Sequence, residues 1–414
     1  MRVAIIGGGP AGSTSAALLA RSGADVVIFE EGNRPEVIAG ESLVPGVIPI
    51  LRRLGIEDQV AQIGVRKPGV TFYSSEGRAF AFGFDSLPGK YPPYAYNVPR
   101  PEFDNLLFES ALGSGAQSIG AKAIIRAEGI RLRLAPESLN LVSRWKGNQP
   151  DLVVDATGRR RISANLLKIG SKTGPRRDVA HFAHYEGFLP ESPAGQVLIN
   201  HLDHGWSWRI PLRGRMSFGI VLDQKAAASL GREPAERLDA AMRGNPQISG
   251  AIRNVRRISE PQTYANYQLI SDQGAGSNWA AVGDAFGFVD PMLSPGMMIA
   301  MQGAVLLEDS LSRLPMDQAL ATYAAEITGL LEAWMNFIAY FYDGRIFSMH
   351  ENATDFQSRH RYLPTSIIEQ FVRSHLASMA SGFTTDSPYS LGVLRGFERF
   401  AAGGRTPAGS LAII

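Results

Sequence analysis

The chain has 414 residues, of which 45% are hydrophobic and 19% charged, and its formal net charge is +2. These values are typical of a large globular protein and exclude a disordered or fibrous chain. No block of lysine or arginine marks a nucleic-acid surface, so we expect no nucleic-acid partner. The absence of cysteine excludes disulfides and cysteine nucleophiles, so any redox chemistry must come from a cofactor.

The first thirty residues predict a strand–helix–strand unit. Residues 2–6 are an apolar run typical of a buried strand, residues 11–21 have a helical pattern that stops at Gly23, and residues 25–29 form a second strand. The first run is too short for a secretory signal, and no apolar stretch reaches 18 residues. We therefore expect a parallel sheet, no transmembrane segment and a cytoplasmic location.

A glycine-rich turn joins the first strand to the helix. Its sequence is Gly7-Gly8-Gly9-Pro10-Ala11-Gly12. In a GxGxxG turn the first glycine allows the sharp bend, the second admits a pyrophosphate, and the third lets helix and strand pack closely. The helix N-terminus offers N–H groups to phosphate oxygens, and Glu30 is placed to accept hydrogen bonds from a ribose. The turn predicts a dinucleotide site without deciding between NAD and FAD.

Later segments predict how the first sheet is completed. Residues 66–84 alternate around Gly77 and predict a hairpin, residues 101–112 predict a helix, and residues 152–154 predict a buried strand. Residues 279–282 predict another buried strand, followed by a helix over 297–313. We expect the first domain to be built from residues 1–85, 95–160 and 279–315.

Between residues 178 and 222 several short strands follow one another without helices, which favours a mainly antiparallel second sheet. Residues 86–94 and 161–278 are therefore assigned to a substrate domain. Residues 316–414 are predicted to form a helical C-terminal region that covers the pocket. The fold class is mixed α/β, with a Rossmann-like βαβ domain interleaved with an antiparallel-sheet domain.

Two further motifs carry a family resemblance. Asp155-Ala156-Thr157-Gly158 follows one buried strand, and Gly283-Asp284-Ala285 follows another and continues to Asp290-Pro291. Together with GGGPAG, they resemble the para-hydroxybenzoate hydroxylase-fold flavoproteins, which bind FAD. The resemblance implies an FAD site that includes Asp155, Gly158, Arg100, Gly283, Asp284, Pro291, Gly296 and Met297, in addition to the glycine turn. It also implies that the helix starting near Met297 points its N-terminus at the flavin.

Three segments indicate which branch of this family the chain resembles. Gly40-Glu41-Ser42-Leu43-Val44-Pro45 resembles a segment shared by flavin-dependent halogenases and geranylgeranyl reductases, which lies beside the flavin, so Glu41 and Ser42 join the predicted site. Trp206-Ser207-Trp208-Arg209-Ile210-Pro211 matches the halogenase pattern WxWxIP. Two tryptophans at this spacing share one sheet face, where they either meet a substrate or simply belong to the core.

Lys67 is the predicted catalytic residue. Lys67-Pro68-Gly69-Val70-Thr71-Phe72 resembles the segment that carries the halogenase lysine, which steers hypohalous acid onto the substrate. A lysine suits this role because an ammonium donates hydrogen bonds and a desolvated amine becomes nucleophilic. The alternative is a solvated lysine on a hairpin.

One segment departs from the halogenase pattern. Ser294-Pro295-Gly296 stands where halogenases have Ser-Ser-Gly or Ser-Thr-Gly, and proline lacks the backbone N–H that would help to hold halide. Leu293 replaces the glutamate of the free-tryptophan halogenases, which argues against free tryptophan as the substrate. Four histidines, His181, His184, His201 and His204, lie in the strand region, where we favour pocket or surface roles over a metal site.

The sequence thus predicts a flavin monooxygenase or halogenase that uses reduced FAD and O2 on an electron-rich aromatic, either free or borne by a carrier protein. No second GxGxxG occurs in a βαβ setting, so the reductant is expected from a separate flavin reductase or from NAD(P)H. The alternative is a reductase of prenyl double bonds that resembles geranylgeranyl reductase.

Overall fold

The computed structural model describes residues 1–32, 35–174, 176–266, 268–345 and 365–402. Its first sheet is entirely parallel, and its strand order is β19-β10-β1-β2-β7. The bounds are β1 Arg2–Ile6, β2 Asp25–Phe29, β7 Gln117–Ile119, β10 Leu152–Asp155 and β19 Trp279–Ala281. Val3, Ala4 and Ile5 are fully buried, as expected for a strand covered on both faces. The predicted parallel sheet is confirmed.

Three long helices belong to this sheet. They are α1 (Pro10–Arg21), α4 (Arg100–Gly113) and α10 (Pro295–Arg313), and α1 packs against both α4 and α10. Each begins with proline at one of its first two positions, where the missing N–H costs no helical hydrogen bond. All three helices were predicted, with starts that differ by one or two residues.

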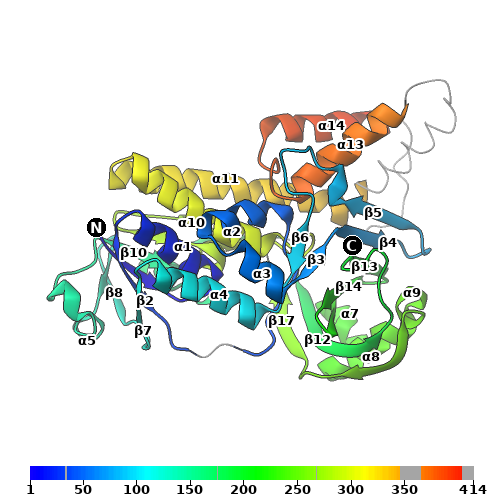
Figure 1. Ribbon diagram of the computed structural model, residues 1–414, viewed down its shortest axis with the longest axis horizontal. Coiled ribbons are helices and arrows are strands. Elements are labelled where there is room, and N and C mark those ends of the chain that lie inside the picture. The colour runs from blue at the N-terminus through cyan, green and yellow to red at the C-terminus, as the bar shows by residue number, and fades with distance from the viewer. Residues whose placement is uncertain (33–34, 175, 267, 346–364, 403–414) are drawn as a thin grey trace.

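The second sheet has the strand order β16-β12-β15-β14-β13-β4-β5, and β17 also pairs with β12. The bounds are β4 Gly69–Tyr73, β5 Ala79–Gly83, β12 Asp178–Phe188, β13 Val197–Leu202, β14 Gly205–Leu212, β15 Arg215–Asp223, β16 Ile252–Arg257 and β17 Gln262–Asn266. Every pair is antiparallel except β13 with β4, which confirms a mainly antiparallel sheet. Helices α7 (Gln224–Ser229) and α8 (Pro234–Gly244) pack against β12 and β15 (Figure 1).

The hairpin of β4 and β5 corrects one prediction. We had counted residues 66–84 with the first sheet, but β4 pairs in parallel with β13, from Val70 opposite Val197 to Tyr73 opposite Asn200. Alternation along a strand identifies its two faces but not the sheet that it joins, so the sequence pattern did not contain this information.

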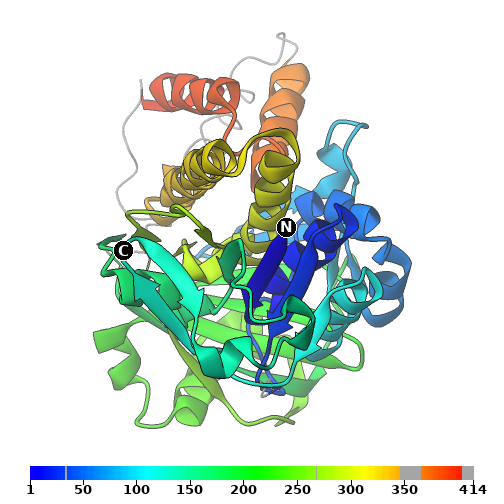
Figure 2. The same ribbon diagram turned by 90° about the vertical axis from the view of Figure 1, so that its left-hand side faces the viewer.

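The C-terminal region is helical where it is described. Its helices are α11 (Met316–Tyr342), α13 (Thr365–Ala380) and α14 (Pro388–Ala402), and α11 packs along α10 (Figures 1 and 2). Helix α13 contacts β5 and the short turn that follows it. Within the described ranges, every helix is too short or too polar to span a bilayer.

The remaining elements are short. They are α2 Ile48–Leu54, α3 Glu57–Ile63, α5 Pro136–Leu139, α6 Ile162–Leu167, α9 Pro246–Ser249, β3 Val65–Lys67, β6 Ala95–Asn97, β8 Ile125–Glu128, β9 Arg131–Leu134, β11 Ser171–Thr173, β18 Leu269–Ser271 and β20 Gly287–Phe288. Among them, β3 and β6 form a two-stranded ladder that matters for the site.

Candidate active site

A cavity of about 430 Å³ lies between the carboxyl ends of the first sheet and one face of the second. Carboxyl ends of parallel strands are where ligands bind in open α/β sheets. The predicted residues that line it are Gly9, Pro10, Ala11, Glu41, Ser42, Arg100, Gly158, Trp206, Trp208, Gly283, Asp284, Pro291, Gly296 and Met297. Sequence reasoning had not named several others, among them Ile38, Arg159 and Tyr264.

The three glycines of the GxGxxG motif, Gly7, Gly9 and Gly12, have different surroundings. A Cβ added to Gly7 would meet the backbone of Ala156, and one added to Gly12 would collide with the carbonyl oxygen of Gly7. A Cβ on Gly9 would meet nothing within 4 Å, and Gly9 lines the cavity. Gly7 and Gly12 therefore serve close packing, and Gly9 leaves room for an incoming group, as a pyrophosphate requires.

Two predicted cofactor acids do not line the cavity. Asp155 accepts hydrogen bonds from the backbone and hydroxyl groups of Ser163 and Thr157, so its carboxylate stabilises the turn after β10. These local donors give Asp155 a structural role in the turn, and its contact with the cofactor stays a prediction. Glu30 accepts a hydrogen bond from the backbone N–H of Gly8 and so fixes the glycine turn.

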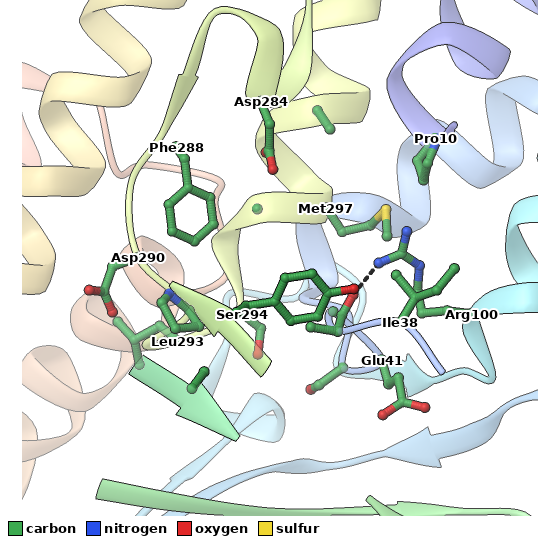
Figure 3. Close-up of a pocket in the computed structure, with 18 of the residues that line it drawn as sticks. Pro10, Ile38, Glu41, Arg100, Asp284, Phe288, Asp290, Leu293, Ser294 and Met297 are labelled. Carbon is green, nitrogen blue, oxygen red and sulfur yellow. Dashed lines mark hydrogen bonds between the residues drawn. The ribbon is translucent and has the colours of Figure 1, made fainter. Parts of the chain in front are cut away.

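Opposite charges meet at the polar end of the cavity. Burial raises the pKa of Asp284, and the charges of Arg159 and Arg100 oppose this rise. Arg100 is buried, forms a two-point ion pair with Asp104 at 2.9 and 3.0 Å, and donates to the carbonyl of Ala39. Arg100 is thus buried and held in place at the cavity wall. Figure 3 shows Asp284 and Arg100 with Met297 between them.

The N-terminus of α10 reaches the cavity through a strained turn. Leu293 and Ser294 both line the cavity and have left-handed backbone conformations, with φ of 67° and 58°. Such conformations cost energy in residues other than glycine and often occur at functional sites. The first turn of α10 brings Gly296 and Met297 to the wall, so its free N–H groups and positive dipole end face the cavity.

The second sheet supplies an apolar wall. It consists of Val70, Phe72, Ala180, Val197, Ile199, Trp206, Trp208 and Ile210. The indole N–H groups are already used, because Trp208 donates to Ser217 and Trp206 to Tyr342. This half of the cavity therefore offers aromatic and aliphatic surface, and the charged lining residues Glu41, Arg100, Arg159, Asp284 and Asp290 all come from outside the second sheet.

Trp206 is part of a buried hydrogen-bonded chain. Its Nε1 donates to the Tyr342 hydroxyl at 3.1 Å, and that hydroxyl donates to Asp290 Oδ1 at 2.8 Å. Burial raises the pKa of Asp290 to about 6. Figure 3 shows the carboxylate of Asp290 directed away from Asp284. The three residues come from β14, α11 and the loop after β20, so nothing in the local sequence indicated that they would meet.

The described parts of the C-terminal helices do not line the cavity. Within the described ranges, the lining ends at Ala300 in α10, and α11 contributes Tyr342 only behind the wall. Helix α11 buries its apolar face against α10 instead, with Ile327, Trp334 and Ile338 fully or almost fully buried.

Lys67 is buried, but it does not line the cavity. Its side chain is 1% exposed, and its ammonium donates to Ser42 Oγ at 2.8 Å and to the carbonyl of Leu43 at 2.9 Å. Burial lowers its pKa to about 7. The alternative of a solvated lysine is thus excluded. Lys67 approaches the cavity from behind Ser42, which does line it.

Two histidines of the strand region, His181 and His184, contact different partners. His184 Nε2 lies 2.7 Å from Glu41 Oε1, and both side chains are buried. His181 contacts Thr263 and Arg237, and its pKa is lowered to about 4 by burial and by that guanidinium. Among the residues that the structure describes, no three acidic or histidine side chains are grouped as a metal site.

Comparison with known proteins identifies the family to which this chain belongs. The family model described as tryptophan halogenase matches residues 2–93 and 88–350. This chain belongs to that family of flavin-dependent halogenases. Membership favours the halogenase branch over the prenyl reductases, and it makes FAD the cofactor.

Three proteins illustrate the relationship. A tryptophan 2-halogenase from Chondromyces crocatus is 30% identical over 83% of this chain and 68% of its own length. A 1H-pyrrole-2-carbonyl-[peptidyl-carrier protein] brominase from Pseudoalteromonas luteoviolacea is 27% identical over 75% of this chain and 77% of its own length. The solved structure of the flavin-dependent brominase Bmp2 covers 98% of this chain and 100% of its own, with a TM-score of 0.79 and 21% identity. Several further curated halogenases align over less than two thirds of their length.

The cavity fits FAD. Gly9 leaves a backbone approach open for the pyrophosphate, Asp284 faces the cavity beside two arginines, and the α10 N-terminus is directed at the same space. These are groups that a phosphate, a polyol chain and an anionic reduced flavin use.

Proposed function

We propose that this halogenase-family protein oxidises a halide and attaches it to an uncharged, electron-rich aromatic ring. Bound reduced FAD supplies the two electrons with which O2, halide and a proton give hypohalous acid and water. The observation that carries the proposal is the buried ammonium of Lys67, which meets the wall of the FAD cavity at Ser42.

The polar end of the cavity positions the cofactor. Arg100, held by Asp104, and the N–H groups at the start of α10 favour negative charge in the reduced flavin. Asp284 suits the polyol side of the cofactor. The apolar wall excludes water, which protects a reactive hypohalous acid and strengthens each polar contact near it.

The apolar wall also indicates the substrate. It offers no charged partner for an amino-acid carboxylate or ammonium, and a buried unpaired charge costs several kcal/mol. We therefore favour a neutral phenol, indole or pyrrole, either free or attached through a neutral linkage to a carrier protein, over free tryptophan. Leu293, at the position of the glutamate of free-tryptophan halogenases, supports the same choice. A separate flavin reductase or NAD(P)H would supply the reductant.

Hydroxylation is the second candidate, and Pro295 favours it. Proline at the first turn of α10 removes one N–H that could hold halide beside the flavin. A hydroxylase would use O2 on the same aromatic ring and would need no halide.

One experiment separates these functions. The protein is incubated with reduced FAD, O2, bromide and a panel of phenols, indoles and pyrroles, and products are read by mass spectrometry. We expect the paired mass peaks of a brominated product, which disappear when bromide is omitted. Oxygenated product without bromine would support hydroxylation. Matched pairs such as tryptophan and 3-methylindole test the preference for a neutral ring, and better bromination of tryptophan would contradict it.

A further inference from the structure

Lys67 and the FAD cavity are separated by one side chain. Lys67 is absent from the cavity wall, whereas Ser42 lies on the wall and is 1% exposed to solvent. The ammonium donates to the Ser42 hydroxyl at 2.8 Å. A group in the cavity therefore meets Ser42 before it meets Lys67.

A small ladder of strands fixes this arrangement. Lys67 ends β3 and lies opposite Ala95 in β6. On the other side of β6, Ser42 forms a bridge with Asn97, and the Leu43 N–H donates to Tyr96. The lysine side chain thus reaches across β6, where Ala95 presents only a methyl group.

The hydrogen bonds between Lys67 and its neighbours leave the hydroxyl proton of Ser42 available for donation into the cavity. The ammonium has three N–H donors, of which two bind Ser42 Oγ and the Leu43 carbonyl, and the Phe84 ring lies 5.4 Å from Nζ. Within the described residues, no carboxylate pairs with Lys67. Because Ser42 Oγ accepts from Lys67, its own O–H is free to donate, and no acceptor for it is found in the described part of the chain.

We propose that the Ser42 hydroxyl is the catalytic group that contacts hypohalous acid, and that Lys67 acts through it. This inference rests on the proposed halogenase function. The Ser42 O–H donates to the oxygen of the hypohalous acid, and the donor behind it, the Lys67 ammonium, makes that O–H a stronger hydrogen-bond donor.

The step balances as a proton relay. The aromatic carbon attacks the halogen, a carbon–halogen bond forms, and the oxygen–halogen bond breaks with its electron pair going to oxygen. That oxygen takes the Ser42 proton and leaves as water, while Ser42 takes a proton from Lys67. The ring then loses its proton, which restores the ammonium. The sum is Ar–H plus HOX giving Ar–X plus water.

Ser42→Ala, Ser42→Thr, Lys67→Met and the Ser42→Ala/Lys67→Met double variant test the relay. Each is given reduced FAD, O2, bromide and the best aromatic of the panel, and a β-diketone scavenger reports hypobromous acid that escapes. The readout is brominated product per hypobromous acid formed, so it is independent of how much flavin is bound. Flavin fluorescence titration checks folding and FAD binding.

We expect Ser42→Ala and Lys67→Met each to lower this ratio at least about tenfold, and the double variant to be no worse than either, as for groups that act as a unit. Ser42→Thr, which keeps the hydroxyl, restores the ratio. In the wild type the ratio falls as pH rises above about 7, where Lys67 loses its proton, and in Ser42→Ala this pH dependence is lost.

Two results overturn the relay. One is a wild-type ratio in Ser42→Ala together with a low ratio in Lys67→Met, which would mean that Lys67 contacts the acid directly. The other is additive losses in the double variant. Failure of the proposed function looks different, because the wild type would then release no hypobromous acid and brominate nothing.

Discussion

The indole N–H of Trp206 donates to the Tyr342 hydroxyl, so the last residue of α11 sets the orientation of an aromatic ring on the cavity wall. The same hydroxyl donates to Asp290 in the loop that follows β20. The phenol of Tyr342 therefore connects the loop on the cofactor side of the cavity to the aromatic wall.

Replacing Tyr342 with phenylalanine should loosen Trp206. The variant loses both hydrogen bonds and removes one donor from the buried Asp290 carboxylate, at a cost of about 1–3 kcal/mol in stability. We expect KM for the aromatic to rise several-fold and the ratio of brominated regioisomers to change, because the ring that orients the substrate moves. Steady-state kinetics and product chromatography measure both, and an unchanged KM with unchanged regiochemistry would contradict the prediction. Tyr340→Phe, two residues earlier in the same helix, is a matched control for loss of a helix phenol.

Two glycine variants should separate cofactor binding from folding. In Gly9→Ala the new methyl group meets open space, so the melting temperature of the apoprotein should stay the same while FAD affinity falls at least about tenfold. In Gly12→Ala the methyl group collides with the Gly7 carbonyl, and overpacking of this kind costs about 1–3 kcal/mol or more. Apoprotein melting curves and flavin titrations check the pair. Equal effects of both variants on melting would count against the distinction.

The buried Lys67 should make stability depend on pH. Its folded pKa of about 7 lies below the ordinary value of 10.5, so the unfolded chain binds more protons between these limits. Stability should therefore rise as pH increases from 7 to 10.5, by ~5 kcal/mol at most. Lys67→Met should flatten this rise and should be more stable than the wild type near pH 6. Denaturant unfolding at pH 6, 8 and 10 is the measurement, and parallel pH curves for both proteins would refute the assignment.

Pro295 should limit halide binding. Pro295→Ser restores a backbone N–H at the first turn of α10, so the bromide concentration that gives half-maximal turnover should fall several-fold. The extra chain freedom of the unfolded state should cost about 0.4–1 kcal/mol. Pro234→Ser, at the start of α8 outside the cavity, is the control for this cost and should leave bromide dependence unchanged.

The parts of the site that the sequence predicted are those encoded within a few residues. The glycine turn, Asp284 and the start of α10 each follow a strand directly, so strand order places them at one sheet edge. Trp206 and Trp208 were placed together because alternation puts both on one face.

The remaining parts depend on long-range contacts. His184 meets Glu41 from 143 positions away, and Tyr342 meets Trp206 from 136. The position of Asp155 after a buried strand predicted a contact with the cofactor, but its carboxylate accepts hydrogen bonds from the nearby Ser163 and Thr157. The β4–β5 hairpin was predicted as a hairpin, yet its parallel partner β13 lies more than a hundred residues later, where no local pattern points to it.

The interleaving of the two sheets also sets when the protein can receive its cofactor. The first sheet is complete only when Trp279–Ala281 has been synthesised, and the cavity wall closes only with Ala300. Since domains tend to fold as units while the chain leaves the ribosome, the glycine turn is made first but waits for most of the chain before it has a pocket. Nascent chains that stop before α10 should therefore expose the apolar wall and depend on chaperones rather than on flavin for protection.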